Sequence, residues 1–129
     1  MRACGLIPEI KHSFIHTFCL CVWPVIPDEY GIARAHKEDN VRLPCNMTTA
    51  TATSVTWLHT DESVSRLTYI YANGRIYKRP RWRFDIYNDN VGDYSLTISH
   101  VRPGDAGIYR CYDQLQQRLL QTYTISVRG

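Results

Sequence analysis

Five cysteines carry the most distinctive chemistry in this sequence, because two thiols in an oxidising compartment can form a disulfide. Cys4, Cys19 and Cys21 lie in the N-terminal segment, whereas Cys45 and Cys111 lie in the body of the chain. If the N-terminal segment is removed on secretion, an even pair of cysteines remains. An even number of cysteines is typical of a secreted domain whose cysteines are oxidised to disulfides.

A zinc site is the second chemistry to consider. Two histidines and two cysteines of the N-terminal segment could be imagined as a ligand tetrad, namely His12, His16, Cys19 and Cys21. The Cys-x-Cys spacing is not the usual spacing of a zinc knuckle, and the segment is expected to be removed. We therefore expect no bound metal and no cofactor.

Catalytic groups are sparse. Asp61, Glu62 and Asp89 fall in predicted turns, where a solvated loop is expected rather than a pair of catalytic carboxylates. No Gly-rich phosphate loop, His-Glu-x-x-His helix or nucleophile elbow occurs in the sequence. We therefore expect no catalytic residues and a protein that is not an enzyme.

The length and composition limit the chain to one folded domain. The sequence has 129 residues, of which 44% are hydrophobic and 12% aromatic, and a formal net charge of +3. These proportions suit a globular core and argue against disorder. The charge is modest, and we expect no nucleic-acid partner.

The first 29 residues indicate a signal peptide. Arg2 and Lys11 precede an apolar run over residues 14–26, which polar residues and a proline interrupt. The run is too short and too broken to span a bilayer as a helix. We therefore expect a cleaved leader at residues 1–29, followed by the folded domain at residues 30–129. Because no cleavage site stands out, an N-terminus that is not cleaved is the alternative. The C-terminal end of the sequence, up to Gly129, contains no long hydrophobic stretch and no lipid-anchor tail. We therefore expect either a released domain or the distal part of a membrane receptor. Any contact with a membrane is expected from a segment outside this chain.

Short apolar–polar alternations separated by turn residues recur from Asn40 onward and predict an all-β sandwich. Asn73-Gly74 supplies the two positive-φ positions of a type I′ hairpin turn. Trp82, Phe84 and Ile86 alternate as the buried face of one strand. The expected strands cover residues 31–36, 41–45, 55–58, 67–72, 75–78, 82–86, 94–98, 109–112 and 119–127.

Cys45, Trp57 and the run Asp105-Ala106-Gly107-Ile108-Tyr109-Arg110-Cys111, together with the strand at 94–98, resemble the variable-set (V-set) immunoglobulin domains. The resemblance covers about 100 residues. It implies an immunoglobulin-like β-sandwich of the variable type, with about nine strands in two antiparallel sheets. It also implies one inter-sheet disulfide from Cys45 to Cys111, with Trp57 packed against it.

Two details refine the resemblance. The segment 66–74 looks like the C′ hairpin of butyrophilin and myelin oligodendrocyte glycoprotein domains. The Phe-Gly-x-Gly joining motif of antigen-receptor domains has no counterpart in residues 116–121. The sequence therefore favours a germline-encoded adhesion or immune co-signalling receptor over a rearranging antigen receptor.

The resemblance also implies structural roles at the base of the sandwich. Asp105 is expected to pair with an arginine at the start of strand D, the strand expected at 82–86, and this arginine is either Arg81 or Arg83. If the buried pair of this strand begins at Trp82, Arg81 is the partner; if it begins two residues later, Arg83 is. We favour Arg81. The Tyr109 hydroxyl is expected to bond to backbone near the preceding turn.

V-set domains commonly bind through the sheet of strands G, F, C and C′, which are expected here around residues 119–127, 109–112, 55–58 and 67–72, and the resemblance implies a binding face there. With Trp57 and Cys111 facing the core, alternation turns several large side chains outward. They are Leu58, Tyr69, Tyr71, Arg110 and Tyr112. Tyrosine and arginine are enriched at protein interfaces, although tyrosine also favours any solvated sheet. We expect a protein partner, such as another immunoglobulin domain or a second copy in a weak homodimer, outside the cell or at its surface.

A basic run offers a different class of function. Five cations lie close together in the sequence: Arg75, Lys78, Arg79, Arg81 and Arg83. They could attract an acidic glycan, as in a soluble, secreted polyanion-binding module. Against this, one arginine is expected to be structural, and basic side chains also protect an edge strand from aggregation.

A glycosylation sequon occurs at Asn46-Met47-Thr48. It predicts a glycan on Asn46, directly after the first cysteine of the domain. Access to this asparagine decides whether the sequon is used.

Overall fold

The computed structural model describes residues 23–46, 54–61, 63–86 and 92–129. Several predictions fall outside these ranges. They concern the leader up to residue 22 with its cysteines and histidines, the two sequon residues after Asn46, Glu62, Asp89 and most of the turn at 88–92.

The described residues form nine strands and two short 3-10 helices. In chain order these are β1 (Ile32–His36), β2 (Val41–Leu43), β3 (Val55–Asp61), β4 (Arg66–Ala72), β5 (Arg75–Ile76), η3 (Arg81–Arg83), β6 (Phe84–Ile86), β7 (Leu96–Ile98), η4 (Pro103–Asp105), β8 (Gly107–Asp113) and β9 (Arg118–Arg128).

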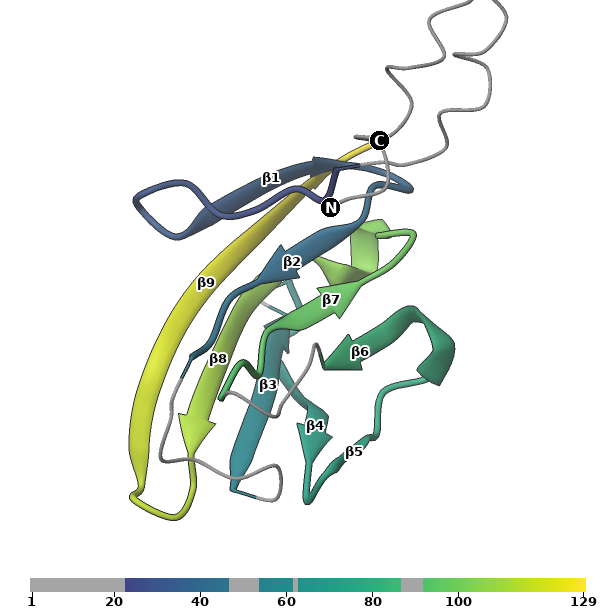
Figure 1. The fold of residues 1–129 in the computed structure, drawn as a ribbon. Coiled ribbons are helices and arrows are strands. Elements are labelled where there is room, and N and C mark those ends of the chain that lie inside the picture. The colour runs from purple at the N-terminus through teal and green to yellow at the C-terminus, as the bar shows by residue number, and fades with distance from the viewer. Residues whose placement is uncertain (1–22, 47–53, 62, 87–91) are drawn as a thin grey trace, which may run out of the picture.

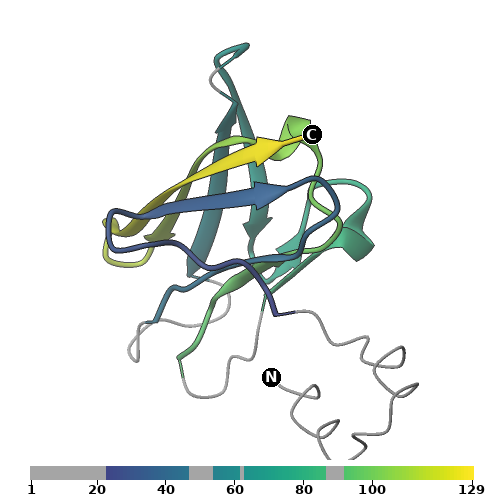
Figure 2. The same ribbon diagram turned by 90° about the horizontal axis from the view of Figure 1, so that it is seen from above.

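The strands form two sheets that pack as layers (Figure 1). One sheet has six strands in the order β1-β9-β8-β3-β4-β5, and the other has three in the order β2-β7-β6. Neighbouring strands are antiparallel except β1 and β9, which run parallel and lie side by side in Figure 2. The expected all-β sandwich of variable type is confirmed.

The core lies between the sheets because each strand buries alternate side chains. Along β8 the buried positions are Gly107, Tyr109, Cys111 and Asp113, and partly exposed residues stand between them. Cys45 and Cys111 form the expected disulfide, with their Cα atoms 6.6 Å apart. This covalent link joins the two layers through the centre of the core.

Trp57 lies at this centre. It is fully buried and occupies the position in β3 directly opposite Cys111. Its indole nitrogen donates a hydrogen bond of 2.8 Å to the Tyr94 carbonyl, on the side of the other sheet. The indole also stacks on Tyr123 of β9, with ring centres 6.3 Å apart. The polar nitrogen is thereby satisfied, and the ring contributes its full area to the core.

The segment before β6 differs from the prediction of a continuous strand over 82–86. Residues Arg81–Arg83 form the turn η3, in which the Arg83 amide donates to the Pro80 carbonyl. A turn does not alternate sides with the period of two of a strand. Trp82 is therefore 65% exposed, and Phe84 is the first buried aromatic residue of the segment.

The ordered contacts of the domain begin before residue 30. Val25 forms a parallel bridge with Val41, and its amide donates to the Asn40 carbonyl at 2.8 Å. The Val25 carbonyl accepts a hydrogen bond from the Arg42 amide. The chain thus touches the three-stranded sheet at Val25 and joins the six-stranded sheet at β1, which begins with Ile32.

Gly107 begins β8 in a conformation that other residues avoid. Its φ is +132°, and a Cβ atom there would overlap the Thr60 carbonyl and approach the His59 ring. Glycine at this position lets β8 pass close to β3 at the base of the sandwich.

Candidate functional site

The outer surface of the six-stranded sheet holds most of the predicted binding residues. Leu58 of β3 is opposite Arg110 of β8 on one side and Tyr69 of β4 on the other, so these three side chains share a face. The chain neighbours Trp57 and Cys111 are fully buried. Because side chains alternate along a strand, Leu58, Arg110 and Tyr69 point away from the core.

Two leucines that the sequence analysis did not select extend this surface. Leu119 of β9 is opposite Tyr112, and Leu67 lies two residues before Tyr69 on the same side of β4. The exposed fraction is 57% for Leu67, 51% for Tyr69 and 47% for Leu119. The set is called the outer face below and comprises Leu58, Leu67, Tyr69, Arg110, Tyr112 and Leu119.

The signals for these two leucines differ. Alternation counted back from Tyr69 places Leu67 on the outside, so the sequence contained that information. Leu119 was hidden by a bulge: Cys111 pairs with Gln121, but Tyr112 pairs with Leu119, and the ladder skips Leu120. A bulge inverts the alternation beyond it.

Tyr71 does not lie on the outer face, contrary to the prediction. It is only 6% exposed and belongs to the core. The cause is a second bulge: Trp57 pairs with Tyr71, whereas Leu58 pairs with Tyr69, and Ile70 is left between them. Tyr71 therefore points into the core, as Trp57 does. The prediction assumed that side chains alternate without interruption from Tyr69 through Ile70 to Tyr71, and the bulge breaks this alternation.

Arg110 supplies the positive charge of the outer face. Its guanidinium is half-buried and lies 3.4 Å from the Thr60 hydroxyl. Within the part of the chain that the structure describes, Arg110 forms no ion pair. The face thus surrounds a cation without a local counter-charge by apolar and aromatic side chains.

A polar cluster at the base of the sandwich has the opposite character. Arg83, not Arg81 as favoured from the sequence, pairs with Asp105 through two hydrogen bonds of 2.8 and 3.1 Å. Arg83 is 3% exposed, because η3 turns Trp82 outward and directs the next side chain inward. Arg81 remains exposed.

Asp105 and its neighbours fix this base. The Asp105 carboxylate accepts a third hydrogen bond, of 2.8 Å, from the Arg102 amide to the Oδ2 atom that also contacts Arg83. The Tyr109 hydroxyl donates to the Asp105 carbonyl at 2.6 Å, the type of backbone bond that the V-set resemblance implies. Burial raises the pKa of Tyr109 well above its usual value, and the Asp105 charge adds to this effect. Tyr109 therefore stays neutral and acts as a structural donor.

His59 completes the cluster. Its ring stacks on Tyr109 with ring centres 4.3 Å apart, and Nε2 lies 2.8 Å from the Ala106 carbonyl. A carbonyl only accepts hydrogen bonds, so Nε2 carries a proton. Burial lowers the pKa of His59, against the opposing effect of the Ala106 bond. The buried imidazole is therefore neutral at pH 7.

Asn46 is exposed and forms an isolated bridge with Asp93. Its side chain is accessible despite its position beside the buried Cys45, and the glycan remains a prediction.

Two kinds of feature are absent from the residues that the structure describes. No group of three or more His, Cys, Asp or Glu side chains could hold a metal ion there. Within the same ranges, no helix has the length and apolar character needed to cross a membrane.

Comparisons with known proteins agree with the architecture. The family model described as "Immunoglobulin V-set domain" matches residues 33–128. None of the curated proteins compared with the chain matches it.

Solved structures show the same fold. The structure titled "Crystal structure of Dpr1 IG1 bound to DIP-eta IG1" has a TM-score of 0.63 at 19% identity, covering 83% of this chain and 92% of the other. The structure titled "Crystal Structure of the RIG-5 IG1 homodimer" has a TM-score of 0.62 at 18% identity, covering 83% of this chain and 100% of the other.

Proposed function

We propose, from the premise that this chain belongs to the immunoglobulin V-set family, that it binds an extracellular protein partner through its outer face. The observation that carries the proposal is the gathering of Leu67, Tyr69 and Leu119, each about half exposed, around partly buried Arg110. An exposed apolar and aromatic patch on a soluble domain is typical of a protein interface.

The proposed partner is another immunoglobulin domain. The similar structures were solved with Dpr1 bound to an IG1 domain of DIP-eta and with RIG-5 as a homodimer, which supports this class of partner. The Cys45–Cys111 disulfide supports a location in the oxidising space outside the cell. The narrower resemblance to butyrophilin domains remains a prediction.

Arg110 and the two tyrosines have separate roles in this proposal. Tyr69 and Tyr112 supply rigid contact area with a polar tip. Arg110 offers a guanidinium to a carboxylate or carbonyl group of the partner, and its attraction strengthens once water leaves the interface. A single face of this size gives a weak contact that multivalency at a cell surface would strengthen.

The test uses the domain in multimeric form against a panel of immunoglobulin ectodomains, together with sedimentation of the free domain to detect a homodimer. The double variant Tyr69→Ala/Tyr112→Ala should weaken binding of any partner, or of a second copy, by at least about tenfold. Trp82→Ala is the matched control, because it removes an exposed aromatic ring on the other side of the sandwich. Binding that survives the double variant and is lost in Trp82→Ala would move the interface to the three-stranded sheet.

A further inference from the structure

The five cations of the basic run separate into two groups in the structure. Arg83 is buried against Asp105, and Lys78 is half-buried. The other three are exposed and lie together: Arg75, Arg79 and Arg81.

These three arginines line one pocket at and after β5, the edge strand of the six-stranded sheet at the end opposite β1. The pocket has a volume of about 250 Å³, and Ile76 and Tyr77 complete its wall. None of the three arginines forms an ion pair with another described residue. Three arginines thus line one pocket whose lining residues include no carboxylate, and an entering anion would offset their mutual repulsion.

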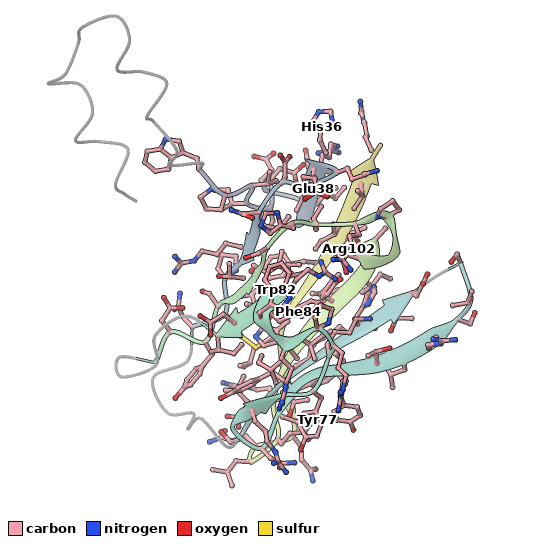
Figure 3. All side chains as sticks on the ribbon, turned by 90° about the vertical axis from the view of Figure 1, so that its right-hand side faces the viewer. His36, Glu38, Tyr77, Trp82, Phe84 and Arg102 are labelled. Atoms are coloured by element: carbon pink, nitrogen blue, oxygen red, sulfur yellow. A yellow bond between two sulfur atoms is a disulfide. The ribbon has the colours of Figure 1, made fainter. Side chains whose placement is uncertain are left out.

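The wall of the pocket is held in place before any ligand arrives. The Tyr77 amide donates to the Ile70 carbonyl at 2.8 Å, which ties the segment after β5 to β4. The Tyr77 hydroxyl accepts a hydrogen bond of 3.3 Å from Asn73, and the Arg75 guanidinium lies 5.5 Å from the centre of the ring. Figure 3 shows Tyr77 at the end of the molecule opposite His36 and Glu38.

We infer that this pocket binds a sulfated glycan, with the arginines on a sulfate group and Tyr77 beside the sugar ring. A tetrahedral oxyanion presents several oxygens at once, and arginine donates paired hydrogen bonds to such groups. The Tyr77 ring is 42% exposed and offers a rigid plate for the C–H face of a sugar.

A glycan is favoured over other carriers of a tetrahedral anion. The disulfide places the domain in an oxidising compartment outside the cell, where sulfate esters of glycans are available. An aromatic wall contributes to binding a sugar and adds nothing to binding inorganic phosphate.

The experiment measures binding of a heparin-derived tetrasaccharide by calorimetry in 150 mM salt, an ionic strength at which loose surface attraction is screened over about 8 Å. Arg79→Gln/Arg81→Gln should weaken the affinity by about tenfold or more, because two paired contacts are removed. The control Lys37→Gln/Arg128→Gln removes the same charge at the opposite end and should change the affinity by less than about twofold.

A second variant separates a built site from a charged surface. Tyr77→Ala should weaken tetrasaccharide binding severalfold without changing its dependence on salt, since no charge is removed. The desulfated tetrasaccharide should not bind. Equal losses of affinity in Arg79→Gln/Arg81→Gln and in the control Lys37→Gln/Arg128→Gln would contradict a binding site at this pocket. Tighter binding of a soluble inositol polyphosphate than of the tetrasaccharide would contradict a glycan as the ligand. Neither result depends on the outer face, so the two proposals fail separately.

Discussion

The base of the sandwich and the outer face use the same residue types for opposite purposes. At the base, Arg83 and Tyr109 are buried and bonded to fixed partners. On the outer face, Arg110 and Tyr69 are at least partly exposed and leave their charge and ring to solvent. Residue type alone therefore does not predict a role; the position of each side chain relative to turns and bulges does.

The largest effect should come from breaking the buried ion pair at the base. Arg83→Ala leaves the Asp105 carboxylate buried without its partner, and we expect a loss of about 3–5 kcal/mol in the free energy of unfolding. Arg81→Ala, two residues away, should change this quantity by less than about 0.5 kcal/mol. Chemical denaturation of both variants measures the difference. Equal losses would show that the pairing seen at Arg83 does not stabilise the domain.

An intermediate effect should come from pH, also at the base. Because burial lowers the pKa of His59 in the folded state, the unfolded chain binds the proton more tightly. The contribution of neutral His59 to the free energy of unfolding should therefore be fully present above the pKa of 6.5 in the unfolded chain, and it should be lost as the pH falls below that value. The slope is at most about 1.4 kcal/mol per pH unit for one proton.

Denaturation of the wild type and of His59→Gln between pH 7.5 and 5 measures this effect. The variant keeps a donor for the Ala106 carbonyl but cannot titrate, so its stability should change less over this range. A profile parallel to that of the wild type would assign the pH dependence to other groups.

The smallest effect on stability should come from the outer face. Tyr69→Ala/Tyr112→Ala removes side chains with few fixed partners, and the free energy of unfolding should change by less than about 1 kcal/mol. Thermal denaturation of the double variant gives the comparison. A loss as large as that of Arg83→Ala would mean that these tyrosines support the fold, and the contrast between the two regions would not hold.

The β-sandwich could be predicted because its strongest signals are residue types at fixed spacings along the sequence. Cys45, Trp57 and Cys111 have the spacing of the V-set domains, and the structure brings them together as that resemblance implies. The strand alternation around them places Leu58, Arg110 and Tyr112 on one face. These positions follow from a period of two, which the backbone imposes.

The errors arose where that period is interrupted. The turn η3 moved the buried arginine from residue 81 to residue 83 and left Trp82 exposed. The bulge at Ile70 turned Tyr71 inward, and the bulge at Leu120 brought Leu119 to the surface. The two bulges depend on the register with the neighbouring strand, and η3 depends on a local bond from the Arg83 amide to the Pro80 carbonyl. Alternation read along a single strand carries neither signal.

The parallel seam between β1 and β9 gives the domain a mechanical property. Ile32 is opposite Thr124 at one end of the seam, and His36 is opposite Arg128 at the other. A tensile force applied to the two ends of the domain would pull these strands in opposite directions along a shared axis. The hydrogen bonds of the seam would then bear the load together, in shear, instead of separating one at a time.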